Sequence, residues 1–300
     1  MTISNQRHNI RDGMQSLADI VRKHKTTIVH GNGPQVGLLM LESDAYERQT
    51  GLQQISLDVL DAETEGMIGY MIEQELQPYL SQDQGMVTVL SQIVVSPDDP
   101  SMLNPTKFVG PVYTKEEANK LSVPVKADGK YFRRVVPSPQ PIKLVPHQLQ
   151  VVQKLTDAGC IVICGGGGGI PVVEKEGRYE GIEAVIDKDR AATMIGKAIG
   201  AQGLLILTDI PAVAIHYGTE QQKFIKTISP NQLETLKDHF PAGSMGPKVE
   251  SAIDFVRLTN GWAAIGSLQN ADEIVAGKAG TMVRDTPTDD PVVFYEKGDI

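Results

Sequence analysis

Four clusters rich in glycine or lysine lie at predicted loop positions, and residues of this kind could bind an anion. The first, HGNGPQVG, runs from His30 to Gly37 after a short strand, and its Pro34 can begin the next helix. The second, CGGGGGIP, runs from Cys164 to Pro171, and the entropic cost of five consecutive glycines favours close approach of a ligand to the backbone. Neither has the GxxxxGK[ST] or GxGxxG pattern, so neither of those nucleotide-binding mechanisms is predicted.

The other two clusters each carry a lysine. AVIDKDRAA places Lys188 between Asp187 and Asp189 where a short strand meets a helix, and AGSMGPK places Lys248 in a loop before the helix VESAIDFVRL. Each has a structural alternative: acidic caps at a solvated helix start for the first, and an N-cap by Ser244 followed by proline for the second. Four such clusters in one chain, two of them with lysine, nevertheless predict a site that neutralises phosphate.

The elements that must position these clusters alternate between helix and strand. Helices are expected at 15–24, 58–80, 147–158 and 188–199, and strands at 26–30, 87–95, 160–164 and 204–209. This alternation predicts an α/β fold, a three-layer α/β/α sandwich around a mostly parallel sheet, with ligands at the carboxyl ends of the strands. Prolines gather between residues 96 and 141, which predicts a small inserted subdomain.

Composition limits the classes of function. The 300 residues are 41% hydrophobic, enough for a substantial core, and 28 Lys and Arg against 37 Asp and Glu give a net charge of −9. This charge disfavours nonspecific binding to nucleic acid or to an anionic membrane. No apolar run is long enough to span a bilayer and the start lacks a signal-peptide pattern, so a cytoplasmic location is expected. Cys160 and Cys164, the only cysteines, are expected to be buried and reduced.

The order of several sequence strings indicates a family. The strings are HGNGPQVG, ETEGMIGYMIEQEL, NPTKFVGPVY, RRVVPSPQP, GGGGIPVV, EAVIDKD, LLILTD, AGSMGPK and AGTMV. In this order they resemble the carbamate kinases of the amino acid kinase family, and the resemblance extends from the first residues to about Val283. It implies reversible phosphoryl transfer between carbamoyl phosphate with ADP and carbamate with ATP, in arginine or related nitrogen catabolism.

The resemblance also implies an organisation for the chain. One amino acid kinase domain would span 1–300. Its N-terminal lobe (1–190) would bind carbamate and carry the protruding subdomain at about 96–141, and its C-terminal lobe (191–300) would bind the nucleotide. A homodimer is implied, with the apolar segment Met67–Ile72 as a candidate surface; ordinary core packing is the alternative for that segment.

Roles for single residues follow from the same resemblance. Lys107, on the protruding subdomain, would reach the transferred group, Lys188 and Lys248 would stabilise it, and Asp189 would hold these two lysines. Mg²⁺ would bind through the nucleotide phosphates and not through protein side chains. The substrate would be held by backbone amides of Gly31, Asn32, Gly33, Gly166, Gly167, Gly168 and Gly169, and the nucleotide would lie near Asp209, Tyr217, Met245, Gly246 and Pro247.

The chain departs from the family pattern at its start. Carbamate kinases begin with a hydrophobic strand and a GGNA turn before the helix that here begins near Asn5. An upstream start codon is the favoured explanation, and a true truncation that impairs catalysis is the alternative. Two other functions remain open: a sister kinase for another small carboxylate, and a binding or partner subunit without turnover.

Overall fold

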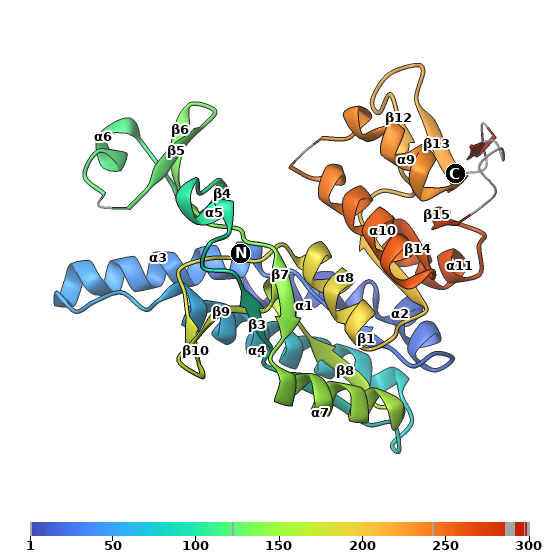
Figure 1. Cartoon of the computed structure of the whole chain (residues 1–300), viewed down its shortest axis with the longest axis horizontal. Coiled ribbons are helices and arrows are strands. Elements are labelled where there is room, and N and C mark those ends of the chain that lie inside the picture. Colours follow the sequence, from blue (N-terminus) through green and yellow to red (C-terminus); the bar gives the residue numbers. More distant parts are fainter. Residues whose placement is uncertain (1, 122, 242, 286–291, 297, 299–300) are drawn as a thin grey trace.

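The computed structural model describes residues 2–121, 123–241, 243–285, 292–296 and 298 (Figure 1). Helices and strands alternate along most of the chain, as expected. The elements before the glycine run are α1 (Ile3–Arg11), α2 (Met14–Val21), β1 (Thr27–Ile28), α3 (Gly33–Thr50), α4 (Leu57–Leu76), the 3₁₀-helix η1 (Gln77–Tyr79), β2 (Met86–Val89), β3 (Gln92–Val95), α5 (Pro100–Leu103), β4 (Lys107–Tyr113), α6 (Lys115–Ala118), β5 (Val125–Asp128), β6 (Tyr131–Val136), β7 (Pro141–Leu144), α7 (Pro146–Asp157) and β8 (Ile161–Cys164).

The second part of the chain continues the alternation. Its elements are η2 (Gly166–Gly168), β9 (Ile170–Lys175), β10 (Arg178–Gly181), α8 (Lys188–Ala198), β11 (Gly203–Thr208), β12 (Ala214–Ile215), β13 (Lys223–Ile228), α9 (Pro230–Thr235), η3 (Lys237–His239), α10 (Met245–Thr259), β14 (Trp262–Ser267), η4 (Leu268–Asn270), α11 (Ala271–Val275), β15 (Thr281–Arg284) and β16 (Val293–Phe294). For the helices and strands that the sequence predicted, most boundaries lie within two residues of the expected ones.

Strand β8 shows the layered arrangement most clearly. Ile161 and Ile163 pack in clusters with α2 and α4, whereas Val162 and Cys164 pack in a cluster with α7 and α8. Alternate side chains of a strand point to opposite faces of its sheet, so helices cover both faces at this position. Strand β8 pairs in parallel with β1 on one side and with β2 on the other.

The expected single strand at 87–95 is wrong, because two strands lie there. Val89 of β2 pairs with Cys164 of β8, and Gln92 of β3 pairs with Ile170 of β9. Two residues separate the paired positions on one side and five, the glycines 165–169, separate them on the other. The same two stretches of chain therefore pair twice, and the glycine run forms a large, mostly buried bulge between the two ladders.

The expected central sheet is divided. Within the described residues the strands form four hydrogen-bonded sheets, ordered β1-β8-β2, β10-β9-β3-β7, β11-β14-β15-β13-β12 and β4-β6-β5, with β16 also paired to β13. The first sheet is all parallel, and the second has one parallel pair, β9–β3, between two antiparallel edge strands. The third sheet is mixed, since β11–β14 and β15–β13 are parallel pairs while β14–β15 and β13–β12 are antiparallel. The bulge at 165–169 separates the first two sheets, because it interrupts the ladder between them.

The proline-rich segment forms a separate projection at the upper left of Figure 1. There β4, β6 and β5 form an antiparallel sheet, and a capping box between Thr114 and Glu117 begins the short helix α6. This sheet lies within the region 96–141 that the prolines indicate. Its strand β4 begins at Lys107.

The C-terminal part has its own core. Its largest cluster of buried residues joins α10 with β11, β13, β14 and β15. On β14, Ala263 and Ile265 belong to this cluster, while a side chain at Gly266 would meet Ile274 of α11 on the opposite face. Helix α8 packs against both this part, through α10 and β11, and the N-terminal part, through β7 and η2. The proposed lobe boundary at 190 therefore falls inside the helix that joins the two parts.

Smaller expectations have mixed outcomes. Cys160 and Cys164 are both free thiols, but Cys160 is only half-buried because it precedes β8. After β15, the short strand β16 pairs with β13, and residues 286–291, 297 and 299–300 lie outside the described residues. Across the part of the chain that the structure describes, no helix is both long and apolar enough to cross a membrane.

Candidate active site

Two of the three candidate lysines share one carboxylate. The Nζ atom of Lys188 lies 2.8 Å from Oδ1 of Asp189, and that of Lys248 lies 3.0 Å from Oδ2 of the same residue. Lys188 and Asp189 begin α8, whereas Lys248 lies in the first turn of α10. The packing of α8 against α10 thus joins two sequence clusters that lie about sixty residues apart.

The third lysine comes from the projecting subdomain. Lys107 Nζ lies 3.3 Å from Oδ2 of Asp187, the N-cap residue of α8. The other oxygen of Asp187 accepts hydrogen bonds from the backbone amides of Asp189 and Arg190, so it caps the helix as its structural alternative predicted. The cluster is therefore a capped helix start, and its two carboxylates also pair with three lysines.

Burial and neighbouring charges act differently on these groups. Burial tends to lower the pKa of Lys188, but the charge and hydrogen bond of Asp189 outweigh it and raise that pKa. Burial, followed by the nearby Lys188 cation, lowers the pKa of Lys248. Burial opposes ionisation of Asp187, yet the Lys107 cation and the cap hydrogen bonds keep its pKa low. Three lysines against two carboxylates leave a positive balance suited to an anion.

The first glycine turn lies beside the lysines. A Cβ atom on Gly31 would lie 3.2 Å from Cδ of Lys188, so this turn and the lysine are neighbours. Gly31 and Gly33 are exposed, and the structure gives the amides of Gly31, Asn32 and Gly33 no protein acceptor among the described residues. These amides lie at the start of the 18-residue helix α3, where Asn32 is the N-cap and Gly33 the first residue, and the positive dipole end of the helix also favours an anion.

The second glycine cluster, 165–169, was expected to hold the substrate through the backbone amides of Gly166–Gly169, but these amides have partners within the protein. Gly166 donates its amide to Oε1 of Glu65, and the amides of Gly167, Gly168 and Gly169 donate to the carbonyls of His30, Gly165 and Gly166. These donors are engaged within the protein, because the bulge closes on itself as a tight turn. In this structure the run shapes the site, and the free amides belong to the first turn.

Sequence reasoning did not single out the polar side chains of α4. Asp61, Thr64 and Glu65 are all buried on one face of this helix. The side-chain amide of Asn32 donates hydrogen bonds to Asp61 and to Thr64, each at 3.0 Å. Glu65 accepts hydrogen bonds from the backbone amides of Ser91 and Gly166, each at 2.9 Å. The spacing i, i+3, i+4 of polar residues at core positions of an apolar helix was the available signal.

The two buried carboxyl groups have raised pKa values. Burial raises the pKa of Asp61 to about 8, and the Glu65 charge adds to this effect. Burial raises the pKa of Glu65 to about 7, although the amides of Ser91 and Gly166 act in the opposite direction. Burial also lowers the pKa of His30, whose ring lies where a side chain on Gly166 would have to go. The polar groups beneath both turns therefore favour their neutral forms.

The residues expected near the nucleotide lie in the C-terminal part. Met245, Gly246 and Pro247 form the first turn of α10 and directly precede Lys248. Asp209 is exposed after β11 and accepts a hydrogen bond from Thr208, and Tyr217 is exposed after β12. The first group thus lies next to the lysines. In the described structure no hydrogen bond or ion pair joins Asp209 or Tyr217 to these lysines.

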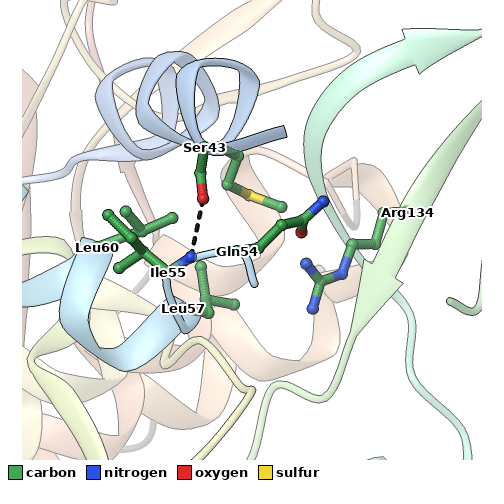
Figure 2. Close-up of a pocket in the computed structure, with 7 residues that line it drawn as sticks. Ser43, Gln54, Ile55, Leu57, Leu60 and Arg134 are labelled. Atoms are coloured by element: carbon green, nitrogen blue, oxygen red, sulfur yellow. Dashed lines mark hydrogen bonds between the residues drawn. The ribbon is translucent and has the colours of Figure 1, made fainter. Parts of the chain in front are cut away.

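A small pocket lies at the base of the projecting subdomain and is too small for a substrate. Figure 2 shows it between Ser43 of α3, the start of α4 and Arg134 of β6. Its volume is about 10 Å³. Such a volume holds about one water molecule. Arg134 forms an ion pair with one carboxylate oxygen of Glu183, and the other oxygen accepts a hydrogen bond from the backbone amide of Leu57 at the start of α4. This pair attaches the subdomain to the body of the protein.

Comparisons with known proteins agree with this geometry. The sequence profile of the amino acid kinase family matches residues 1–265. The chain therefore belongs to the amino acid kinase family. It is 45% identical to a carbamate kinase of Haemophilus influenzae, over 94% of this chain and 91% of that protein, and 41% identical to a carbamate kinase of Pyrococcus horikoshii, over 94% and 93%.

A solved structure shows the same fold. The carbamate kinase of Giardia lamblia bound to AMP-PNP superposes with a TM-score of 0.88 at 34% identity, covering 94% of this chain and 92% of that one. This likeness confirms the predicted fold class, and the relatives confirm the predicted family.

Proposed function

We propose that this protein is a carbamate kinase that transfers a phosphoryl group reversibly between carbamoyl phosphate with ADP and carbamate with ATP. One observation carries the proposal: Lys107, Lys188 and Lys248, from three separate segments, meet at the two carboxylates that flank Lys188. The family membership and the names of the relatives support the same reaction.

The chemistry fits this arrangement. In phosphoryl transfer negative charge spreads over the equatorial oxygens of the transferred group, so catalysis consists mostly of positioning and cationic stabilisation. Lys188 and Lys248, held by Asp189, would neutralise that charge, and Lys107 would do so from the subdomain. The free amides of Gly31–Gly33 would bind the carbamoyl end, while Gly166–Gly169 would shape the pocket around it.

The nucleotide is proposed to bind along the C-terminal part near Met245–Pro247, Asp209 and Tyr217. The G. lamblia enzyme was solved with AMP-PNP, which supports a nucleotide site in this fold. Mg²⁺, when bound with the nucleotide, would add positive charge at the phosphates. We propose that it is held by those phosphates, since Asp187 and Asp189 already pair with lysines.

Cellular context and assembly are also proposals. We place the protein in the cytoplasm, forming ATP from carbamoyl phosphate in arginine or related nitrogen catabolism, as a homodimer. The segment Met67–Ile72 is mostly core, because Ile68, Met71 and Ile72 are buried within the chain and Tyr70 is exposed. Exposed apolar side chains of α3 and α4, including Leu38, Leu41, Val59 and Tyr70, support a dimer surface there. Light scattering gives the oligomeric state.

The test of the proposed reaction is a coupled assay of ATP formation from carbamoyl phosphate, ADP and Mg²⁺. Lys188→Ala is expected to lower kcat by about 10²–10³-fold, because it removes one cation from the transition state. Lys197→Ala, in the last turn of the same helix and exposed, is the matched control and should leave kcat unchanged. ADP binding without turnover by the unaltered protein would instead indicate a binding subunit, and turnover only with another small acid would indicate a sister kinase.

A further inference from the structure

The polar face of α4 touches both glycine turns. Asp61 and Thr64 each accept one hydrogen bond from the side-chain amide of Asn32, which lies between Gly31 and Gly33. Glu65, one helical turn after Asp61, accepts a hydrogen bond from the backbone amide of Gly166 with one oxygen and from that of Ser91 with the other. A single helix thus connects the turn after β1 with the bulge after β8.

Glu65 lies at the point where the paired strands change register. Ser91 is in the two-residue gap between β2 and β3, and Gly166 is in the five-residue gap between β8 and β9. The Ser91 hydroxyl accepts the amide of Gly165, and its carbonyl accepts the amide of Ile170. The carboxyl group of Glu65 therefore joins the two strands in the gap between their two ladders, together with these bonds of Ser91.

The two turns also contact each other directly. Gly167 donates its amide to the carbonyl of His30 at 2.7 Å, and a side chain on Gly167 would overlap the Asn32 amide group. Any displacement of the bulge would therefore reach Asn32 and the free amides next to it. Those amides lie beside Lys188, as the position of Gly31 shows.

We propose that Asp61, Thr64 and Glu65 are positioning residues that set the distance between the first glycine turn and the bulge, and so the shape of the carbamoyl subsite. The proposal rests on the proposed function for its substrate. These side chains lie beneath the turns and are buried, so they act through Asn32 and Gly166 and not by contact with substrate. Their effect should be on carbamoyl phosphate and not on ADP, whose proposed site lies in the C-terminal part.

The kinetic test compares variants along α4. Glu65→Ala is expected to raise KM for carbamoyl phosphate about tenfold or more, with KM for ADP within about twofold, because small misplacements of a binding group are costly. Glu65→Gln keeps one acceptor oxygen and should restore part of the loss. Thr64→Val keeps the side-chain shape but removes one partner of Asn32, and should raise the same KM about three- to tenfold.

Glu73→Ala is the matched control, since its carboxylate also accepts a hydrogen bond, from Thr88, but touches neither turn. It should leave both KM values unchanged. Equal rises in both KM values, or unchanged kinetics in Glu65→Ala and Thr64→Val, would overturn the proposal and leave these residues as ordinary core groups.

Hydrogen–deuterium exchange of the same variants separates this proposal from the proposed function. Peptides covering 29–36 and 162–170 should exchange faster in Glu65→Ala than in the unaltered protein. In Glu73→Ala their exchange rates should equal those of the unaltered protein. If the unaltered protein shows no turnover of carbamoyl phosphate, the proposed function fails, while exchange still decides whether α4 holds the turns. Unchanged exchange in both peptides would overturn the positioning role.

Discussion

At the scale of single residues, the site depends on carboxyl groups in two different states. Asp187 and Asp189 pair with lysines, and the pKa of Asp187 is held low. Asp61 and Glu65 lie deeper, and burial raises their pKa values to about 8 and about 7. The charged pair of residues can hold cations for an anionic group, while the buried pair accepts hydrogen bonds from the turns.

The raised pKa values predict a pH dependence of stability. The folded protein keeps Asp61 and Glu65 protonated to about pH 8 and 7, whereas the unfolded chain releases these protons near its ordinary values of 3.8 and 4.5. The unfolded state binds fewer protons in this window, so the free energy of unfolding should fall as pH rises from about 5 to 8. Each group contributes up to about 1.4 kcal/mol per pH unit.

Urea unfolding at several pH values in this window measures the slope. Asp61→Asn should make it shallower, since the amide does not titrate. Glu63→Gln, on the same helix and exposed, serves as the control and should keep the slope of the unaltered protein. A slope in Asp61→Asn equal to that of the unaltered protein would show that this carboxyl group does not titrate in the expected range.

At the scale of elements, the bulge between β8 and β9 organises the N-terminal part. It ends one ladder and begins another, and its glycines pack against neighbouring segments too closely for a side chain. Gly168 has a φ of +110°, and a Cβ atom there would overlap the carbonyl of Ile186, just before the cap of α8. The bulge thereby lies against the segment that leads to Lys188.

Two glycine substitutions separate backbone strain from steric overlap. Gly177→Ala changes a glycine with a φ of +76° and open space around it, so it should cost about 1–2 kcal/mol of stability. Gly168→Ala adds the overlap with the Ile186 carbonyl and should cost about 1–3 kcal/mol more. Denaturant unfolding of both variants gives the difference. Equal losses would mean that the bulge can move away from Ile186 without cost.

At the scale of the whole molecule, the site is assembled from three parts. Lys107 belongs to the projecting subdomain, Lys188 to the helix that joins the two main parts, and Lys248 to the C-terminal part. The subdomain is attached to the body by Arg134 and Glu183, and α8 to α10 by a hydrogen bond from Thr193 to the Ser251 carbonyl as well as by Asp189. The relative placement of these parts determines whether the three cations meet.

Lys107→Ala tests this dependence on the subdomain. Its ion pair with Asp187 is half-exposed, so loss of the pair should change stability by no more than about 1 kcal/mol. Turnover should nevertheless fall about 10²-fold, because the lysine is expected to act on the transferred group. Lys126→Ala, on the same subdomain and hydrogen-bonded to Asn104, should change neither quantity. A large loss of stability in Lys107→Ala would point to a structural role.

Local patterns in the sequence predicted much of the fold and part of the candidate site. Helical and strand periodicity located α2, α4, α7, α8, β1, β8 and β11, since it records which face of each element is buried, and the prolines located the projecting subdomain. The glycine and lysine clusters indicated Gly31–Gly33, Lys188 and Lys248. Lys107 and Asp189 came with the family resemblance, and Lys107 carries no local pattern of its own.

Only the tertiary structure decided how these residues meet. The break at Ser91 was not predicted, because VTVLSQIVV reads as one continuous strand and the register change depends on a partner about 75 residues away. The internal use of the Gly166–Gly169 amides and the role of Asp61, Thr64 and Glu65 likewise depend on α4 packing beneath both turns. A local pattern records burial and backbone freedom, whereas hydrogen-bond partners between distant segments are set only when those segments pack together.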